Sequence, residues 1–345
     1  MKSLLIAAFA LAAAAAPSLA NDTMSQLGTG GLVFITTTDV SMDSEDLSVG
    51  PDQVKVVYEF TNHAKDDQTA LVAFPLPDIT GDGDFMVSIP TEDPTNIFGF
   101  ATTFDGKPVE STLHQYAFAV GVDQTELLKS LDVPLVPFGE ATTKALNALT
   151  PEQQQDLVHL GMVIPMTYDA GNGEQTDYTP IWTLRSTYTW EATFKAGDTA
   201  EVVHIYKPSV GGTVATIFLS PPMDATDEDR PKIYKDKYCV DDGLVKTLKK
   251  QLKDPGDLYS APYTESWISY IWSTGANWGG PIGKFHLSID KGDPKNLVSF
   301  CWDGKVTKTG PTTFEMDATD WYPPYGHELE VLILNHQDPQ PDNVG

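Results

Sequence analysis

The clearest hydrophobic pattern in the chain lies between positions 181 and 194, where apolar and polar residues alternate strictly. Successive side chains of a strand point to opposite faces of a sheet, so a period of two predicts a strand with one apolar face. A strand with this pattern belongs to an antiparallel sheet that covers a core on one side. We expect Trp190 to lie in that core and Glu191 to face solvent.

Similar strand signals run along most of the chain, separated by turns rich in Gly, Pro and Asp. The Asp-Gly pair at 105–106 predicts a hairpin between 97–104 and 109–120. The fold class is therefore predicted to be mostly β, as one or more antiparallel β-sandwich modules with small helical insertions. The other predicted strands cover 32–37, 54–60, 69–76, 202–206, 267–272, 285–289, 297–302, 312–316 and 329–334.

The apolar spacing becomes helical over 123–165, which predicts a helical insertion in this β protein. Thr150, Pro151 and Gln153 form a typical helix start, with an N-cap, a proline at the first helical position and a capping box. A second short helix is predicted near 244–252.

The first twenty residues have the order of a secretory signal peptide. Lys2 supplies a positive charge, an alanine-rich apolar run follows, and small residues precede the expected cut between Ala20 and Asn21. An uncleaved anchor is disfavoured because the apolar run is shorter than the roughly 20 residues that span a bilayer. No later segment is long and apolar enough to be a second span. We therefore expect a periplasmic or secreted protein with no membrane span in the mature chain.

These patterns divide the chain after the signal peptide (1–20) into four parts. An N-terminal β-sandwich part covers 21–122, and the helical insertion over 123–165 follows it. A C-terminal β part covers 166–336, and a loose polar tail covers 337–345. The pattern is compatible with one β domain or with two.

The chain has 22 Lys and Arg residues against 48 Asp and Glu residues, for a formal net charge of −26. Such an acidic surface repels the phosphates of nucleic acids and of anionic lipids, so nucleic acid is excluded as a partner. Solubility explains the charge more simply than attraction of a basic partner, and both interpretations fit the composition.

Cys239 and Cys301 are the only cysteines in the sequence. In an oxidising compartment outside the cytoplasm, an isolated pair of cysteines favours a disulfide. Two independent buried thiols are the alternative. A redox-active pair is disfavoured because the two residues do not have the C-x-x-C spacing.

Three sets of short motifs occur in order along the chain: 31–34 with 42–47, 56–62 with 74–77, and 273–278 with 300–301 and 312–315. In combination they resemble the exported bacterial family known as domain of unknown function 4424. The resemblance covers nearly all of the mature chain. It implies an exported protein of unassigned role, and it carries over no catalytic residue.

A weaker resemblance concerns Asn62 and the segments 74–77 and 105–108. Their order is similar to that in the β-sandwich domain that precedes the von Willebrand A domain of inter-alpha-trypsin inhibitor heavy chains. This resemblance supports a sandwich at the N-terminal end. It does not indicate an activity, because such folds host many functions.

Familiar catalytic and metal-binding signatures are missing from the sequence. There is no G-x-S-x-G motif, and the seven histidines occur without H-E-x-x-H. His204 lies within a predicted strand, and we expect a hydrogen-bonded core residue there. We therefore predict no catalytic residue, no metal ligand and no cofactor.

Asp78, Asp82 and Asp84 crowd a glycine-rich loop, and closely spaced carboxylates of this kind can bind calcium. Their spacing does not match the twelve-residue calcium loop, which also ends in a glutamate. An ordinary acidic turn is therefore the favoured interpretation, with calcium binding as the alternative.

Aromatic residues gather in the last third of the chain. Trp278, Trp321 and Tyr322 lie in turn-rich segments beside glycine or proline. Exposed rings in such places can stack on sugars or peptides, so these three residues are candidates for a ligand platform.

The sequence favours a non-enzymatic binding or envelope-assembly protein of the periplasm, with an unknown protein or glycan partner. A carbohydrate-active enzyme of the cell envelope is the alternative. That alternative depends on the acidic residues Asp317, Asp320 and Glu328. Two of them would need to lie within roughly 5 to 9 Å of each other after folding.

Overall fold

The computed structural model describes residues 22–28, 31–81, 86–169, 171, 173–220, 229–252, 260–324 and 326–338. The expected signal peptide and its cut between Ala20 and Asn21 lie outside these residues, as does most of the expected tail. The protein is mostly β, with 46% strand and 17% helix, as the sequence predicts. Within the described ranges, no helix is long and apolar enough to cross a membrane.

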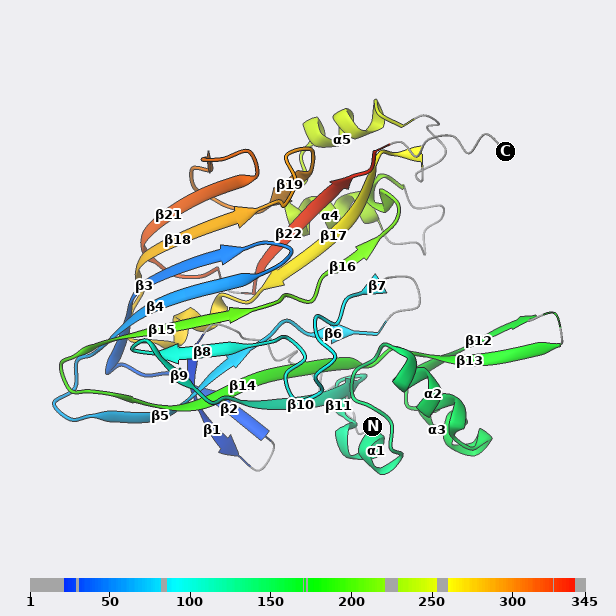
Figure 1. Ribbon diagram of the computed structural model, residues 1–345, viewed down its shortest axis with the longest axis horizontal. Helices are drawn as coiled ribbons and strands as arrows, with labels where there is room; N and C mark the ends of the chain where they lie inside the picture. Colours follow the sequence, from blue (N-terminus) through cyan, green and yellow to red (C-terminus); the bar gives the residue numbers. More distant parts are fainter. Residues whose placement is uncertain are drawn as a thin grey trace, which may run out of the picture.

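The largest sheet contains strands from both ends of the chain (Figure 1). β3 and β18 are parallel neighbours in it, and the other neighbours described are antiparallel. The order of its eight described strands is β20 (Thr307–Lys308), β21 (Thr313–Trp321), β18 (Ile282–Asp290), β3 (Val40–Val49), β4 (Val54–Asn62), β15 (Thr199–Tyr206), β8 (Ala101–Phe104) and β9 (Lys107–Val109).

Two further sheets pack against this one. The first has the order β11 (Val122–Asp123), β10 (Thr112–Ala119), β14 (Thr183–Phe194), β5 (Gln68–Pro75), β1 (Thr23–Gly28) and β2 (Gly31–Ile35), with β6 (Ile79–Thr80) beside β14. The second has the order β19 (Leu297–Phe300), β22 (Leu329–His336), β17 (Tyr263–Tyr270), β16 (Gly211–Thr213) and β7 (Met86–Val87). In Figure 1 these two sheets lie at the bottom and at the upper right.

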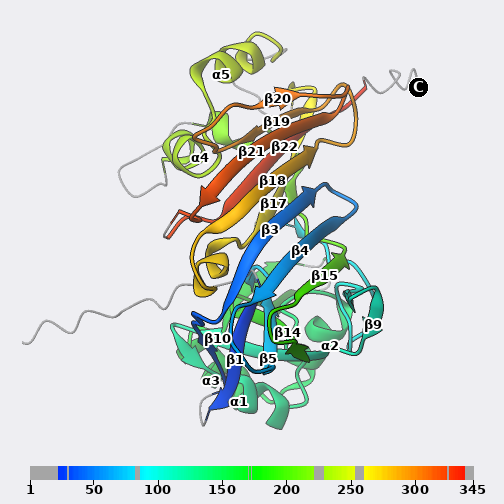
Figure 2. The ribbon, with the colours of Figure 1, turned by 90° about the vertical axis from the view of Figure 1, so that its left-hand side faces the viewer.

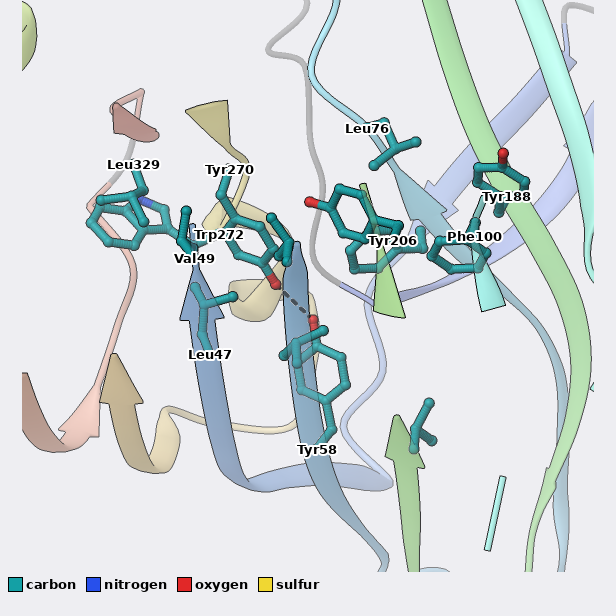
Figure 3. Packing of buried hydrophobic residues seen from close by; sticks show 14 of the residues in the cluster. Leu47, Val49, Tyr58, Leu76, Phe100, Tyr188, Tyr206, Tyr270, Trp272 and Leu329 are labelled. Atoms are coloured by element: carbon teal, nitrogen blue, oxygen red, sulfur yellow. Dashed lines mark hydrogen bonds between the residues drawn. The ribbon is translucent and has the colours of Figure 1, made fainter. Parts of the chain in front are cut away.

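One face of the eight-stranded sheet covers a core that is shared by all three sheets. Alternate residues of β4 are buried, as its sequence pattern predicts. Phe60 of β4 packs edge-on against Phe194 of the β14 sheet, with ring centroids 5.8 Å apart. Its neighbour on the same face, Tyr58, shares a 2.9 Å hydrogen bond with Tyr270 of β17 (Figure 3). The eight-stranded sheet is therefore the common layer of two sandwiches.

A buried pair of polar side chains ties the start of the described chain into this core. The Asp22 carboxylate lies 3.0 Å from Nε2 of His204 on β15, and both side chains are fully buried. The other ring nitrogen of His204 is 3.0 Å from Oγ1 of Thr102. Burial raises the pKa of Asp22 above its ordinary value, and His204 opposes that shift. His204 is a core residue, as the sequence indicated.

Strand β14 follows the predicted alternation at Trp190, which is buried, and at Glu191, which is exposed. The alternation fails in the middle of the strand, where Thr187 and Thr189 are also buried. β14 lies between β10 and β5, so side chains of these neighbouring strands on the same face flank Thr187 and Thr189. Thr189 is satisfied there by a 2.9 Å hydrogen bond with His114.

The helical region contains α1 (Thr125–Ser130), α2 (Glu140–Ala148) and α3 (Pro151–His159). The capping box at Thr150 and Gln153 is present, with both of its hydrogen bonds formed. These helices share a small core with Trp182, whose indole donates to the Leu135 carbonyl at 2.7 Å.

A two-stranded hairpin, β12 (Val163–Asp169) and β13 (Glu174–Pro180), projects beyond these helices at the right of Figure 1. The sequence pattern did not predict it. Apolar and polar residues alternate over only part of β12, and nearly all of that strand is exposed.

Two helices follow β16 and the short turn η1 (Ile217–Leu219). α4 (Arg230–Tyr238) ends at Cys239, and α5 (Asp242–Lys249) corresponds to the helix predicted near 244–252. α5 begins where Asp241 accepts a 2.6 Å hydrogen bond from the Leu244 amide, two residues before the predicted start.

The two faces of β14 give a direct test of the core. Trp190→Ala is expected to reduce the free energy of unfolding by about 3 to 5 kcal/mol, because it removes a buried indole and leaves a cavity. Glu191→Ala, one position along on the exposed face, is expected to cost less than about 0.5 kcal/mol. Urea unfolding of both variants measures the difference. Equal losses from the two substitutions would show that the faces are assigned wrongly.

Candidate functional site

A cleft of about 900 Å³ opens at the end of the shared sheet where β21 comes near α4 and β22. Its walls come from α4, from Trp272 just after β17, from the turn after β19, from β21, and from the start of β22 with the segment that leads into it. These elements lie in the upper part of Figure 2. Because they are far apart in the sequence, the cleft exists only in the folded chain.

The floor of the cleft is aromatic. Trp272, Trp302 and Trp321 line it, and the buried ring of Phe285 packs beneath them. Phe285 stacks on Trp321 with ring centroids 4.2 Å apart, and on Trp302 at 5.9 Å. Trp272 meets Trp321 edge-on at 5.2 Å. The partly exposed rings of Trp302 and Trp321 therefore form the aromatic surface of the cleft, and Trp272, which is only 4% exposed, packs against them.

An irregularity in β21 explains why these rings share one face. Phe285 of β18 is paired with Ala318 of β21, and Ile282 with Trp321. Residues three apart face opposite sides of a regular strand. The left-handed backbone of Asp320, with φ of 49°, breaks this alternation just before Trp321, whose ring stacks on Phe285. Gly304 completes the arrangement, because a Cβ at this position would lie only 2.5 Å from Nε1 of Trp302.

Hydrogen bonds hold the inner end of the cleft in place. The Trp272 indole donates to the His327 carbonyl at 2.7 Å. Glu328 accepts from the amides of Trp272 and Ser273 at 2.9 and 3.2 Å, and from the Ser273 hydroxyl at 2.5 Å. Glu328 thereby anchors the start of η3 (Ser273–Asn277).

The two glutamates of the cleft are largely withdrawn from solvent. Burial raises the pKa of Glu328 to about 7, although its hydrogen bonds oppose the shift. Burial also raises the pKa of Glu330, while Lys237 and Ser269 lower it. The Lys237 ammonium lies 3.5 Å from the Glu330 carboxylate. The protonation of Glu328 and Glu330 thus depends on two opposing influences, burial and the neighbouring hydrogen-bond donors and ammonium group.

The three acidic residues singled out from the sequence do not all meet in the cleft. Glu328 lines it, and Asp317 lies at its edge. The Asp317 carboxylate lies 2.8 Å from Nδ1 of His286. Residue 286 points to the face opposite Phe285, because neighbouring residues of a strand alternate. Asp320 is exposed, adopts a left-handed backbone with φ of 49° and does not line the cleft.

The ligand platform expected at Trp278, Trp321 and Tyr322 is only partly present. Trp321 lines the cleft. Trp278 is only 3% exposed, packs on Phe60 and donates its indole N–H to the Asp22 carbonyl, so the expected exposed ring is not observed. Tyr322 is 60% exposed but lies outside the cleft lining.

Two tryptophans that the platform prediction left out also line the cleft. Trp272 and Trp302 follow the ends of β17 and β19, and each precedes or follows a turn. The sequence signal was present, since both belong to the aromatic group of the last third of the chain. What was missing was the pairing that brings them to Trp321.

A disulfide joins Cys239 to Cys301 beside the cleft. Cys239 caps the C-terminal end of α4, and Cys301 itself lines the cleft next to Trp302. The bond therefore connects α4 to the turn that carries Trp302, and both are walls of the same site.

No metal centre is found in the part of the chain that the structure describes, where no three His, Cys, Asp or Glu residues cluster suitably. Of the candidate calcium loop, Asp82 and Asp84 lie outside the described residues. The Asp78 carboxylate forms an ion pair with Arg185 at 3.3 Å.

The fold and the site define a class: a β-sandwich protein with an aromatic cleft at one end of its shared sheet. The family model described as Domain of unknown function (DUF4424) matches residues 20–332, and the chain belongs to this family. The motifs in the sequence predicted this membership.

A crystal structure of a "putative nutrient binding protein" from Legionella pneumophila subsp. pneumophila str. Philadelphia 1 is similar, with a TM-score of 0.46 and 12% identity. The match covers 92% of this chain and 70% of that chain. Similarity at this level carries no argument about function. No curated protein matches the sequence.

The buried carboxyl groups predict how stability depends on pH. Burial raises the pKa of Glu328 and of Glu265, a core residue that accepts a 2.6 Å hydrogen bond from Tyr234, to about 7. A pKa that folding raises means that the native state binds the proton more tightly. This contribution to stability is complete below the ordinary pKa of 4.5 and is lost as the pH rises through about 7.

The free energy of unfolding is therefore expected to fall between about pH 5 and about pH 8. Glu328→Gln and Glu265→Gln should each reduce that fall, because an amide does not titrate. Urea unfolding across this range measures it, with Glu126→Gln on the exposed face of α1 as the control. A fall that is unchanged in both variants would contradict the assignment.

Proposed function

We propose that the protein is an extracytoplasmic ligand-binding protein and that its ligand docks on the aromatic floor of the cleft. The observation that carries the proposal is the aromatic surface of Trp302 and Trp321, backed by the buried Trp272, in a cleft of about 900 Å³. Ligand sites are typically concavities of about 300 to 1,000 Å³ with aromatic walls and a few polar groups. Small solutes, glycans and peptides all present surfaces that stack on tryptophan.

The carboxylates of the cleft favour binding over catalysis. Both oxygens of Glu328 already accept hydrogen bonds from residues 272 and 273. The carboxylate of Asp317 is engaged with His286 on the other face of the sheet. One observation favours glycoside hydrolysis as a second candidate: the pKa of Glu328 is about 7, which suits a general acid.

Location outside the cytoplasm is part of the proposal. The sequence of the first twenty residues supports export, and the disulfide between Cys239 and Cys301 is typical of an oxidising compartment. Protein recovered by osmotic shock is expected to begin at Asn21 and to contain the bond. Mass spectrometry of the intact and the non-reduced digested protein measures both. Recovery of chains that keep Met1 or Lys2 would contradict export with cleavage.

Binding is tested by tryptophan fluorescence, since three of the seven tryptophans line the cleft. A panel of amino acids, amines, oligosaccharides and peptidoglycan fragments is expected to contain a ligand that shifts the emission. Trp321→Ala should weaken its affinity by at least about tenfold, or about 1.4 kcal/mol, because a stacking surface is lost. Tyr322→Ala is the matched control, as this neighbouring ring is exposed outside the cleft.

Two outcomes would contradict the proposal. A panel with no ligand for the native protein, or equal affinities in both variants, would remove the cleft as the binding site. Turnover of a bound polysaccharide that is lost in Glu328→Gln, in a variant that circular dichroism shows to be folded, would favour the hydrolytic candidate instead.

A further inference from the structure

The cleft combines its aromatic floor with an excess of carboxyl groups. Of the charged or titratable side chains among its described lining residues, five are acidic and two are basic. The basic ones are Lys237 and His327. The acidic ones are Asp236, Asp303, Asp317, Glu328 and Glu330.

The single ammonium group does not neutralise this set. Lys237 lies 3.5 Å from the Glu330 carboxylate and 5.3 Å from the centre of the Tyr238 ring. Its charge is therefore already engaged at the wall of the cleft. Asp236 and Asp303 are exposed at the rim, on α4 and on the turn after β19.

A tryptophan face attracts cations because its π electrons make the face negative, and the attraction grows where water is excluded. The exposed carboxylates of Asp236 and Asp303 add a second attraction of the same sign. The other three are already engaged, Asp317 with His286, Glu330 with Lys237, and Glu328 with the residues at 272 and 273. The net charge of −26 extends this field over the molecule and draws cations toward the cleft. A metal ion is a poor candidate, because the described residues supply no cluster of three suitable ligands.

We propose that the cleft selects organic cations, with an amine, quaternary ammonium or guanidinium group seated on the faces of Trp302 and Trp321 beside the exposed carboxylates of Asp236 and Asp303. This inference rests on the proposed function, because it names the chemical class of the ligand that the cleft binds. A neutral sugar would use the same rings without needing the charges, and an anion would be repelled by them.

The test compares two probes of the same shape on the native protein. Choline carries a quaternary ammonium, and 3,3-dimethylbutan-1-ol replaces that group by an uncharged carbon. Choline is expected to bind at least about fivefold more tightly than its neutral isostere in calorimetric titrations. Added sodium chloride should weaken choline binding and leave the isostere unaffected, because salt screens charges. Spermidine, a longer cation, is expected to bind as well.

Substitutions in the cleft test whether choline binds there. Trp302→Leu and Asp303→Asn should each reduce choline affinity severalfold, whereas Glu126→Gln, far from the cleft on α1, should leave it unchanged. Circular dichroism and thermal unfolding check that each variant is folded. The comparison of choline with its isostere needs no variant, so it decides the question even if Trp302→Leu does not fold.

The outcomes separate this inference from the proposed function. Equal or tighter binding of the neutral isostere would overturn selection of cations and leave the cleft as a binding site. Binding of neutral oligosaccharides without binding of choline or spermidine would do the same. If no probe of any class binds, both the cation selectivity and the proposed function are overturned.

Discussion

The parallel pairing of β3 with β18 is the interaction on which the rest of the structure depends. It runs in register from Ser44 beside Lys284 to Val49 beside Ile289. The two strands come from the first and last thirds of the chain, and their hydrogen bonds join both into one sheet. Because this sheet is shared, the β14 sheet and the β17 sheet pack on one continuous core.

The cleft is a consequence of the same pairing. β18 places Phe285 beneath the tryptophans, and β21, the next strand, carries Trp321 to the same face. The opposite wall belongs to the β17 sheet, where Glu328 anchors the turn after Trp272. The Cys239–Cys301 bond then ties α4 to the turn that carries Trp302. The site forms at the end of the shared sheet, between β21, α4 and the segment that leads into β22.

Buried polar groups specify how the layers meet. The Asp22–His204 pair connects the start of β1 to β15, and the Tyr58–Tyr270 hydrogen bond connects β4 to β17. Such pairs add little net stability compared with apolar packing, but removal of one partner leaves a costly unpaired group. They therefore favour one alignment of the sheets over others with similar apolar contact.

The sequence alone determined the features that depend on residues close together along the chain. The β class, the burial of Trp190 against the exposure of Glu191 and the capping box at Thr150 all follow from local periodicity and local hydrogen bonds. Family membership also followed from short motifs.

Only the tertiary structure decided which strands become neighbours, because strand pairing joins residues that are far apart along the chain. The resulting packing of sheets and turns buried Trp278 and Thr187, which the pattern had placed at the surface, and brought Trp272 and Trp302 to Trp321. It also set Asp317 on the other face of the sheet from Phe285. Spacing along a chain carries no information about such distances, and so the cleft could not be read from the sequence.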